Sequence, residues 1–190
     1  MMKPRPVFDH PIHELLRKRW SPRAFSSQPV SEQNVLTLFE AARWAASAMN
    51  EQPWRFIVTR REETEIFQKL AACLNDANRV WAEHAPVLVL TLVQTLFERN
   101  NKPNPWAKHD LGLAVGHLTL QASAMNLYVH NMAGFSADKA KETFALPETL
   151  EPVTMIALGY LGEAEALPEP LRQREMELQT RKSLKTLLRL

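Results

Sequence analysis

The feature that most constrains the fold is a long helical pattern over residues 110–130. Its apolar side chains do not fall on one narrow stripe of a helix. A helix that is apolar on several sides is usually central and buried. We therefore expect this helix in the middle of the fold, packed on more than one side. The apolar positions are Leu111, Leu113, Val115, Leu118, Leu120, Ala122, Met125 and Leu127.

Three other segments predict β-strands. Residues 54–59 are aromatic and β-branched, and residues 87–94 are apolar nearly throughout, as an interior strand would be. Shorter helical patterns lie between them, one capped by Ser31. Because strands and helices mix without strict alternation, repeat or linker, we expect one α+β domain over residues 1–190. The remaining elements are a strand at 152–161, helices near 10–18, 31–46, 62–74 and 137–144, and extended arms at 1–9 and 168–190.

Composition narrows the function classes. The chain has 190 residues, of which 45% are hydrophobic and 23% charged, as in ordinary globular proteins. The net charge of +2 does not indicate a nucleic-acid or membrane-surface protein. The longest apolar stretch, residues 87–93, is too short to span a bilayer, and we expect a cytoplasmic location. The single cysteine, Cys73, excludes an intrachain disulfide and predicts a packing role. No spacing predicts a metal site.

An Arg-rich segment, residues 17–25, is the first candidate site. It holds four positive charges, a hydroxyl and two aromatic rings. Guanidinium groups suit a phosphate dianion because they form charge-assisted, often bidentate hydrogen bonds. The alternative is a solvated basic helix end that offsets the helix dipole. With only five glycines and no Gly-rich loop, the chain would have to hold a phosphate with side chains.

The second candidate is the segment of residues 41–56, where a helix ends and a strand begins. Asn50 and Gln52 offer amide donors and acceptors that suit the edge of a heterocycle. The alternative is structural: the two amides shape a turn, and Pro53 sets the entry of the strand.

Together the two segments resemble the nitroreductase family. That family's N-terminal half runs Arg-Arg-Ser-x-Arg-x-Phe, a Pro-Val turn, then Ala-Arg-x-Ala-Pro-Ser-x-x-Asn-x-Gln-Pro-Trp-x-Phe. Residues 19–25, 29–30 and 42–56 match these motifs in order and at the right separation. Residues 110–114, 132–135, 152–160 and 181–184 resemble the family's central helix, its loop over the flavin, its late strand and its C-terminal basic segment.

The resemblance implies a nitroreductase-like fold, with a central mixed or antiparallel sheet flanked by helices and a C-terminal arm extending onto the partner of a homodimer. It also implies bound FMN in two sites at the interface. Arg19 and Ser21 would hold the FMN phosphate, joined by Arg181 or Lys182, and Arg23 would lie near the pyrimidine side of the ring. The full expected set is Arg19, Trp20, Ser21, Arg23, Ser47, Ala48, Asn50, Gln52, Met132, Ala133, Gly134, Arg181 and Lys182.

Within that set, Ser47, Ala48 and Asn50 would come from the partner subunit, with Gln52 a further ring-side candidate. Ala133 and Gly134 would present backbone N–H groups near flavin N5. The sequence departs from the family at Ala46, which replaces a proline, and at Met125-Asn126-Leu127, which replaces a Gly-Leu pair. It departs again at Ala133, where an acidic residue is common. These departures bear on substrate preference more than on FMN binding.

By the same resemblance the function is an FMN-dependent oxidoreductase with no dedicated catalytic side chain. NADH or NADPH would deliver hydride to flavin N5, and a nitroaromatic, quinone or enone-like acceptor would then take electrons by a ping-pong mechanism. An FMN-binding or storage module without turnover is the alternative, and a scaffold that lost its ligand is a third. The sequence leaves His109 open between the site and the surface, and it predicts packing roles for His117 and His130.

Overall fold

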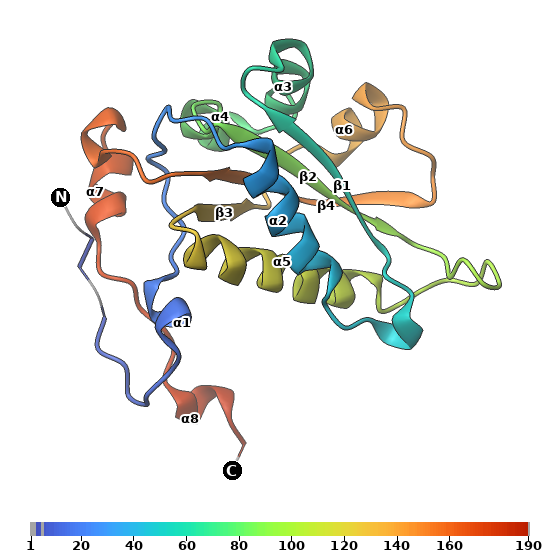
Figure 1. Ribbon diagram of the computed structural model, residues 1–190, viewed down its shortest axis with the longest axis horizontal. Coiled ribbons are helices and arrows are strands. Elements are labelled where there is room, and N and C mark those ends of the chain that lie inside the picture. Colours follow the sequence, from blue (N-terminus) through green and yellow to red (C-terminus); the bar gives the residue numbers. More distant parts are fainter. Residues whose placement is uncertain (1–2, 5, 190) are drawn as a thin grey trace.

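A four-stranded antiparallel sheet forms the centre of the computed structural model, which describes residues 3–4 and 6–189 (Figure 1). The strand order is β1-β2-β4-β3, and each neighbouring pair is antiparallel. The expected mixed or antiparallel sheet is therefore antiparallel. The strands are β1 (Trp54–Arg60), β2 (Val87–Gln94), β3 (Tyr128–Met132) and β4 (Leu150–Gly159).

Strand β2 is buried on both faces, as its apolar sequence predicts. Val87, Val89 and Val93 enter one hydrophobic cluster, and the alternate residues, Leu88, Leu90 and Leu92, enter another. Thr91 breaks the apolar run beside a register shift between β2 and β4. Its buried hydroxyl accepts from the Thr154 N–H at 3.0 Å, so the irregular step in the ladder keeps its hydrogen bonding.

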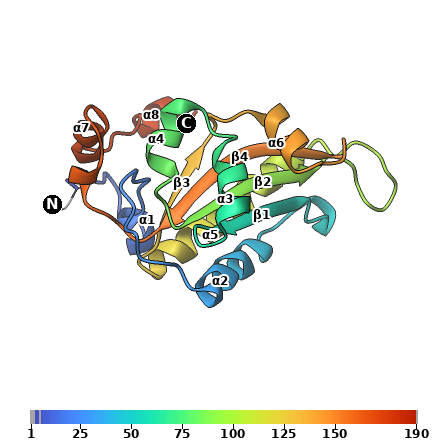
Figure 2. The same ribbon diagram turned by 90° about the horizontal axis from the view of Figure 1, so that it is seen from above.

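Helices cover both faces of the sheet (Figures 1 and 2). α2 and α5 bury apolar side chains with the valine side of β2. α3, α4 and α6 pack on the leucine side. Ser31 caps α2 as predicted, because its hydroxyl accepts from the Asn34 N–H. The bounds are α2 (Glu32–Arg43), α3 (Thr64–Ala71), α4 (Asp76–Ala82), α5 (Ala107–Ala124) and α6 (Ala137–Thr143).

The central helix differs from its prediction in two ways. α5 ends at Ala124 rather than near His130, and the last residues of the predicted helix form β3. Asn126 makes the turn with a φ of 57°, and asparagine follows glycine in tolerance of this left-handed conformation. The helix is also exposed along one side, at Gly112, Leu113, Gly116 and His117, so it is not buried all round within one chain.

Short helices lie beyond the β3 edge of the sheet (Figure 1). The C-terminal arm predicted as extended over 168–190 contains two of them, although its last residue lies outside the described part of the chain. No helix among residues 3–4 and 6–189 is both long and apolar enough to cross a membrane. The remaining elements are α1 (Glu14–Lys18), η1 (Ala48–Asn50), η2 (Ala164–Ala166), α7 (Leu171–Met176) and α8 (Leu184–Leu187).

Candidate functional site

A basic depression of about 570 Å³ lies between the Arg-rich segment and the C-terminal arm. It brings together Arg19, Ser21 and Arg23 with Arg181, which are up to 162 residues apart in sequence. This is the convergence that the sequence analysis expected for a phosphate. The lining residues are Lys3, Arg19, Trp20, Ser21, Arg23, Arg174, Glu175, Glu177, Leu178, Gln179 and Arg181.

Arg19 and Arg181 both line the depression, and their positive charges repel each other. Burial lowers the pKa of the Arg19 guanidinium, and the positive charge of Arg181 lowers it further. Arg19 Nη1 also donates to Ser21 Oγ at 3.3 Å. Two like charges beside a hydroxyl are stabilised by an anion between them, so the depression has the chemistry of an anion site.

The backbone that follows Ser21 is fixed from two sides. A ring nitrogen of His130, on β3, lies 2.8 Å from the Pro22 carbonyl oxygen. On the other side, Glu175 Oε1 accepts from the N–H groups of Arg23 and Ala24, at 2.8 and 3.0 Å. Sequence reasoning missed Glu175, because it lies in a charged tail whose other members are mostly exposed.

His130 packs as predicted. Its ring lies 4.6 Å from that of Trp81, and burial lowers its pKa to about 4, with a smaller effect from the charge of Arg23. The ring is therefore neutral near pH 7, and the bond to the Pro22 carbonyl requires that Nδ1 carry the proton. His117 is exposed on this chain, so its predicted packing role is not seen there. His109 is exposed too.

The second candidate segment adopts a strained turn. Met49, Asn50 and Gln52 have φ values of 55°, 57° and 52°, in the left-handed region that favours glycine. Ser47 Oγ accepts from the Gln52 N–H at 3.0 Å, and Gln52 Nε2 donates to the Asn50 carbonyl at 3.0 Å. The hydroxyl of Ser47 and the amide of Gln52 therefore hold the turn, while the Asn50 side chain is left exposed at its tip.

Asp110 attaches this turn to α5. The residue is only 3% exposed, and its Oδ2 accepts from the Ala48 N–H at 3.0 Å. Asp110 lies in the first turn of α5, where the helix dipole favours a negative charge. Asp110 stands at the predicted start of the central helix, and no sequence pattern indicated its role.

Helix α5 separates the two candidate segments. Asp110 holds the turn at the N-terminal end of the helix, while Lys18, in the Arg-rich segment, donates to Asn126 just beyond the C-terminal end. The 18 residues of α5 span about 27 Å at 1.5 Å per residue. One chain therefore holds the two candidate segments at opposite ends of a helix.

The predicted flavin loop, residues 132–135, begins with the last residue of β3. Met132, which belongs to the expected FMN-contact set, has its side chain buried in the core. The Gly134 carbonyl accepts from the Asn75 N–H and from Asn78 Nδ2, both at 3.1 Å. Ala133 is exposed at the end of the strand. The connection between α3 and α4 thus holds the loop in place.

Two expected contacts are placed differently from the rest. Lys182 is exposed and lies outside the lining of the depression, so Arg181 is the better of the two basic candidates. Trp20 borders the depression but is only 5% exposed, and its ring packs edge-on against Tyr128 at 6.0 Å. No group of three or more His, Cys, Asp or Glu side chains suited to a metal ion occurs among the described residues.

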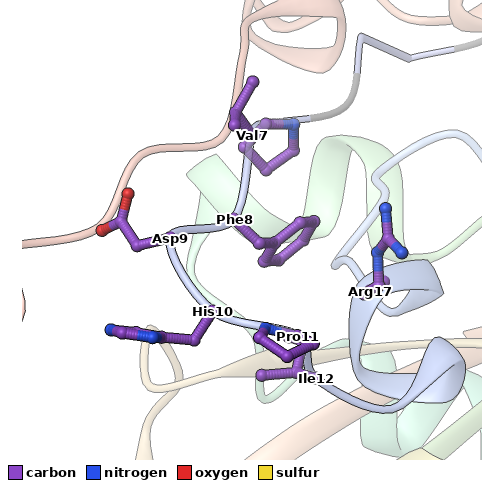
Figure 3. Close-up of a pocket in the computed structure, with 8 residues that line it drawn as sticks. Val7, Phe8, Asp9, His10, Pro11, Ile12 and Arg17 are labelled. Atoms are coloured by element: carbon purple, nitrogen blue, oxygen red, sulfur yellow. The ribbon is translucent and has the colours of Figure 1, made fainter.

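A second depression, of about 390 Å³, is formed by the N-terminal loop itself (Figure 3). Its lining contains Pro6, the residues from Val7 to Ile12, and Arg17, whose guanidinium lies 5.4 Å from the centre of the Phe8 ring. Arg17 is therefore occupied by the loop and does not join Arg19 and Arg181 in the basic depression.

Comparison with known proteins decides the family. The profile described as Nitroreductase family matches residues 16–160. The chain belongs to this family. Its α+β fold is nitroreductase-like, and a solved structure described as an oxidoreductase containing FMN superposes with a TM-score of 0.86 at 30% identity, covering 95% of this chain and 93% of that one. A nitroreductase family protein from Clostridium difficile 630 gives 0.72 at 26% identity, covering 93% and 95%.

Relatives of this nitroreductase-family chain come from distant bacteria. A 15.4 kDa protein of Mycolicibacterium smegmatis is 30% identical over 137 residues, covering 68% of this chain and 90% of the relative. An NADH dehydrogenase of Thermus thermophilus is 27% identical over 189 residues, covering 83% and 89%. The family match over residues 16–160 spans the Arg-rich segment and all four strands of the sheet.

Proposed function

We propose that this chain is an FMN-dependent oxidoreductase that uses NADH or NADPH. The observation that carries the proposal is the convergence of Arg19, Ser21, Arg23 and Arg181 on one basic depression. Their donors fit a phosphate dianion, and the repulsion between Arg19 and Arg181 would be relieved by one. The FMN content of a similar structure at 30% identity supports the same ligand.

When bound, FMN would supply electron transfer between reduced nicotinamide and an acceptor such as a nitroaromatic, a quinone or an enone. The protein's part is to bind and orient. Arg19, Ser21 and Arg181 would hold the phosphate, and Arg23 would place positive charge toward the pyrimidine side of the ring. Backbone N–H groups of Ala133 and Gly134 would approach the ring from the end of β3.

The proposed site needs a second copy of the chain. The turn at residues 47–52 and the Arg-rich segment contact opposite ends of α5, whose 18 residues span about 27 Å, and FMN is shorter than that. Under two-fold symmetry, a partner's turn could meet this chain's Arg-rich segment. The exposed side of α5 and nearby apolar residues offer the surface that such a dimer would bury. Exposed large residues there are Leu36, Trp44, Met49, Trp106 and Leu113.

The C-terminal arm supports the same assembly. In α8 and the residue after it, Leu184, Leu187 and Leu188 are between 41% and 63% exposed. Apolar side chains in a short exposed helix gain stability when a partner surface covers them. We infer that this arm contacts the second subunit of a homodimer.

The direct test is spectroscopic. The purified protein is mixed with excess FMN and then desalted. It should retain the absorbance spectrum of bound flavin, and a colourless protein would refute the proposal. Arg19→Ala should reduce the affinity for FMN at least tenfold but leave the affinity for riboflavin unchanged, because riboflavin lacks the phosphate. Arg79→Ala, at an exposed arginine of α4, is the matched control and should change neither affinity.

Turnover is tested separately under anaerobic conditions. Bleaching of the bound flavin within seconds of adding NADH or NADPH supports the enzyme. Stable binding of FMN with no bleaching by either nucleotide would instead make the protein an FMN-binding or storage module. Acceptors from the three chemical classes can then be compared by reoxidation of the reduced protein.

A further inference from the structure

Glu175 is a buried carboxylate at the edge of the basic depression. It lies in α7, it is only 2% exposed, and it lines the depression together with the three side chains proposed to hold the phosphate, Arg19, Ser21 and Arg181. Glutamate is almost never fully buried unless it is paired. The pairing of this side chain therefore indicates what it does.

The two carboxylate oxygens have different surroundings. Oε1 accepts from two consecutive backbone N–H groups, those of Arg23 and Ala24. Oε2 is buried with no hydrogen-bond partner and lies 3.9 Å from Arg23 Nη1. Oε1 thus holds the main chain of the Arg-rich segment, while the charge on Oε2 attracts the Arg23 guanidinium toward Glu175.

A negative charge here opposes phosphate binding by simple electrostatics. Its presence is explained by the backbone contacts, which no positive side chain could make, because N–H groups need an acceptor. His130 holds the preceding carbonyl, of Pro22, from the opposite side. The peptide units after Ser21 are therefore clamped between β3 and α7.

We propose that Glu175 is a positioning residue for the phosphate end of the cofactor site. By fixing the main chain at Arg23 and Ala24, it directs Ser21 and Arg23 toward the depression that Arg19 and Arg181 also line. The inference rests on the proposed function, since it concerns the FMN phosphate. Glu175, a residue of the C-terminal arm, would thus shape the site without itself binding the ligand.

The test compares dissociation constants for FMN and riboflavin in three proteins. Glu175→Ala removes the acceptor, and the FMN affinity should fall about tenfold, equivalent to about 1.4 kcal/mol, while riboflavin affinity is unchanged. Glu175→Gln keeps an oxygen that can accept from both N–H groups but removes the charge. Its FMN affinity should equal or exceed that of the wild type, because the repulsion of the phosphate is gone.

The signs of these changes separate positioning from charge. If Glu175 acted only through its charge, both variants would bind FMN more tightly than the wild type, and the proposal would be overturned. The proposal is also overturned if Glu175→Gln binds FMN as weakly as Glu175→Ala does, or if Glu175→Ala loses affinity for FMN and riboflavin equally. Should Glu175→Ala fail to fold, Glu175→Asp, which withdraws the acceptor and keeps the charge, takes its place with the same expected loss.

Glu169→Ala is the matched control. It removes a carboxylate from the same arm, and that carboxylate pairs with Arg172 rather than with the Arg-rich segment. The ratio of FMN to riboflavin affinity should stay at the wild-type value, and an equal loss in this variant would refute the specific role of Glu175. A wild type that binds neither flavin refutes the proposed function itself, which is a different result from an unchanged ratio.

Discussion

Replacing Asp110 with alanine should release the strained turn that precedes β1. The carboxylate is nearly inaccessible and accepts from the Ala48 N–H at 3.0 Å. Without it, that N–H loses its partner and α5 loses the negative charge in its first turn. The left-handed residues Met49, Asn50 and Gln52 would then relax, since such conformations persist only where the surroundings hold them.

The magnitude follows from these contacts. A hydrogen bond to a charged acceptor contributes about 1.5–3 kcal/mol. A carboxylate at a helix N-terminus adds about 0.3–1 kcal/mol. The free energy of unfolding of Asp110→Ala should therefore fall by about 2–4 kcal/mol. Asp110→Asn keeps an acceptor oxygen and loses the charge, so its loss should be about 1 kcal/mol.

Urea denaturation followed by circular dichroism measures both losses, with Asp138→Ala, an exposed first-turn carboxylate of α6, as the control. Hydrogen exchange at the Ala48 amide should accelerate in Asp110→Ala and stay slow in Asp110→Asn. If Asp110 positions the turn at residues 47–52 beside the flavin ring, Asp110→Ala should reduce the affinities for FMN and riboflavin to the same extent. Arg19→Ala, by contrast, should reduce the affinity for FMN alone. A loss below about 0.5 kcal/mol in Asp110→Ala would refute the reasoning.

Three further predictions follow from other positions. Gly134→Ala would put its Cβ 2.5 Å from Asn75 Nδ2, whose side chain caps α4, and should lower the melting temperature. A Cβ atom at Gly116 would meet nothing within 4 Å in one chain, so Gly116→Leu should fold, but size-exclusion chromatography should show a monomer if α5 faces a partner. The pKa of His130 is about 4 in the folded protein, against 6.5 for an ordinary histidine. As the pH falls, the unfolded chain therefore takes up this proton before the folded chain does. Stability should thus fall by about 3 kcal/mol as the pH drops from 6.5 to 4, a slope that His130→Gln should remove in pH-dependent urea titrations.

Local patterns were enough to predict much of the fold. The apolar run at 87–94 and the Ser31 cap correspond closely to β2 and α2. The predicted end of the central helix, near His130, was wrong. The chain turns at Asn126 in a left-handed conformation that glycine usually adopts, so no glycine marked the end of the helix in the sequence. Helix α5 packs against α2 and the sheet, as predicted, but it is exposed along one side at Leu113 and His117. The apolar pattern alone did not distinguish the exposed side from the buried ones.

The candidate site was predictable only in part. Side chains whose chemistry suits a ligand, such as Arg19 and Arg181, could be named from motifs. Supporting groups could not be named, because their roles depend on contacts far apart in sequence. Glu175 meets the Arg-rich segment across more than 150 residues, and Asp110 meets Ala48 across 62. A buried carboxylate in a charged stretch has no periodic signal that distinguishes it from its exposed neighbours.

The contact between Glu175 and the backbone of Arg23 and Ala24 also sets an order of events during synthesis. The Arg-rich segment is among the first parts of the chain to be made, while its acceptor is 151 residues behind Ala24. At about 5–20 residues per second, that interval is on the order of 10 s. Until Glu175 has left the ribosome, the two N–H groups must bond to water. The basic depression thus stays unfinished while most of the chain is being made, and its completion is a late step of folding.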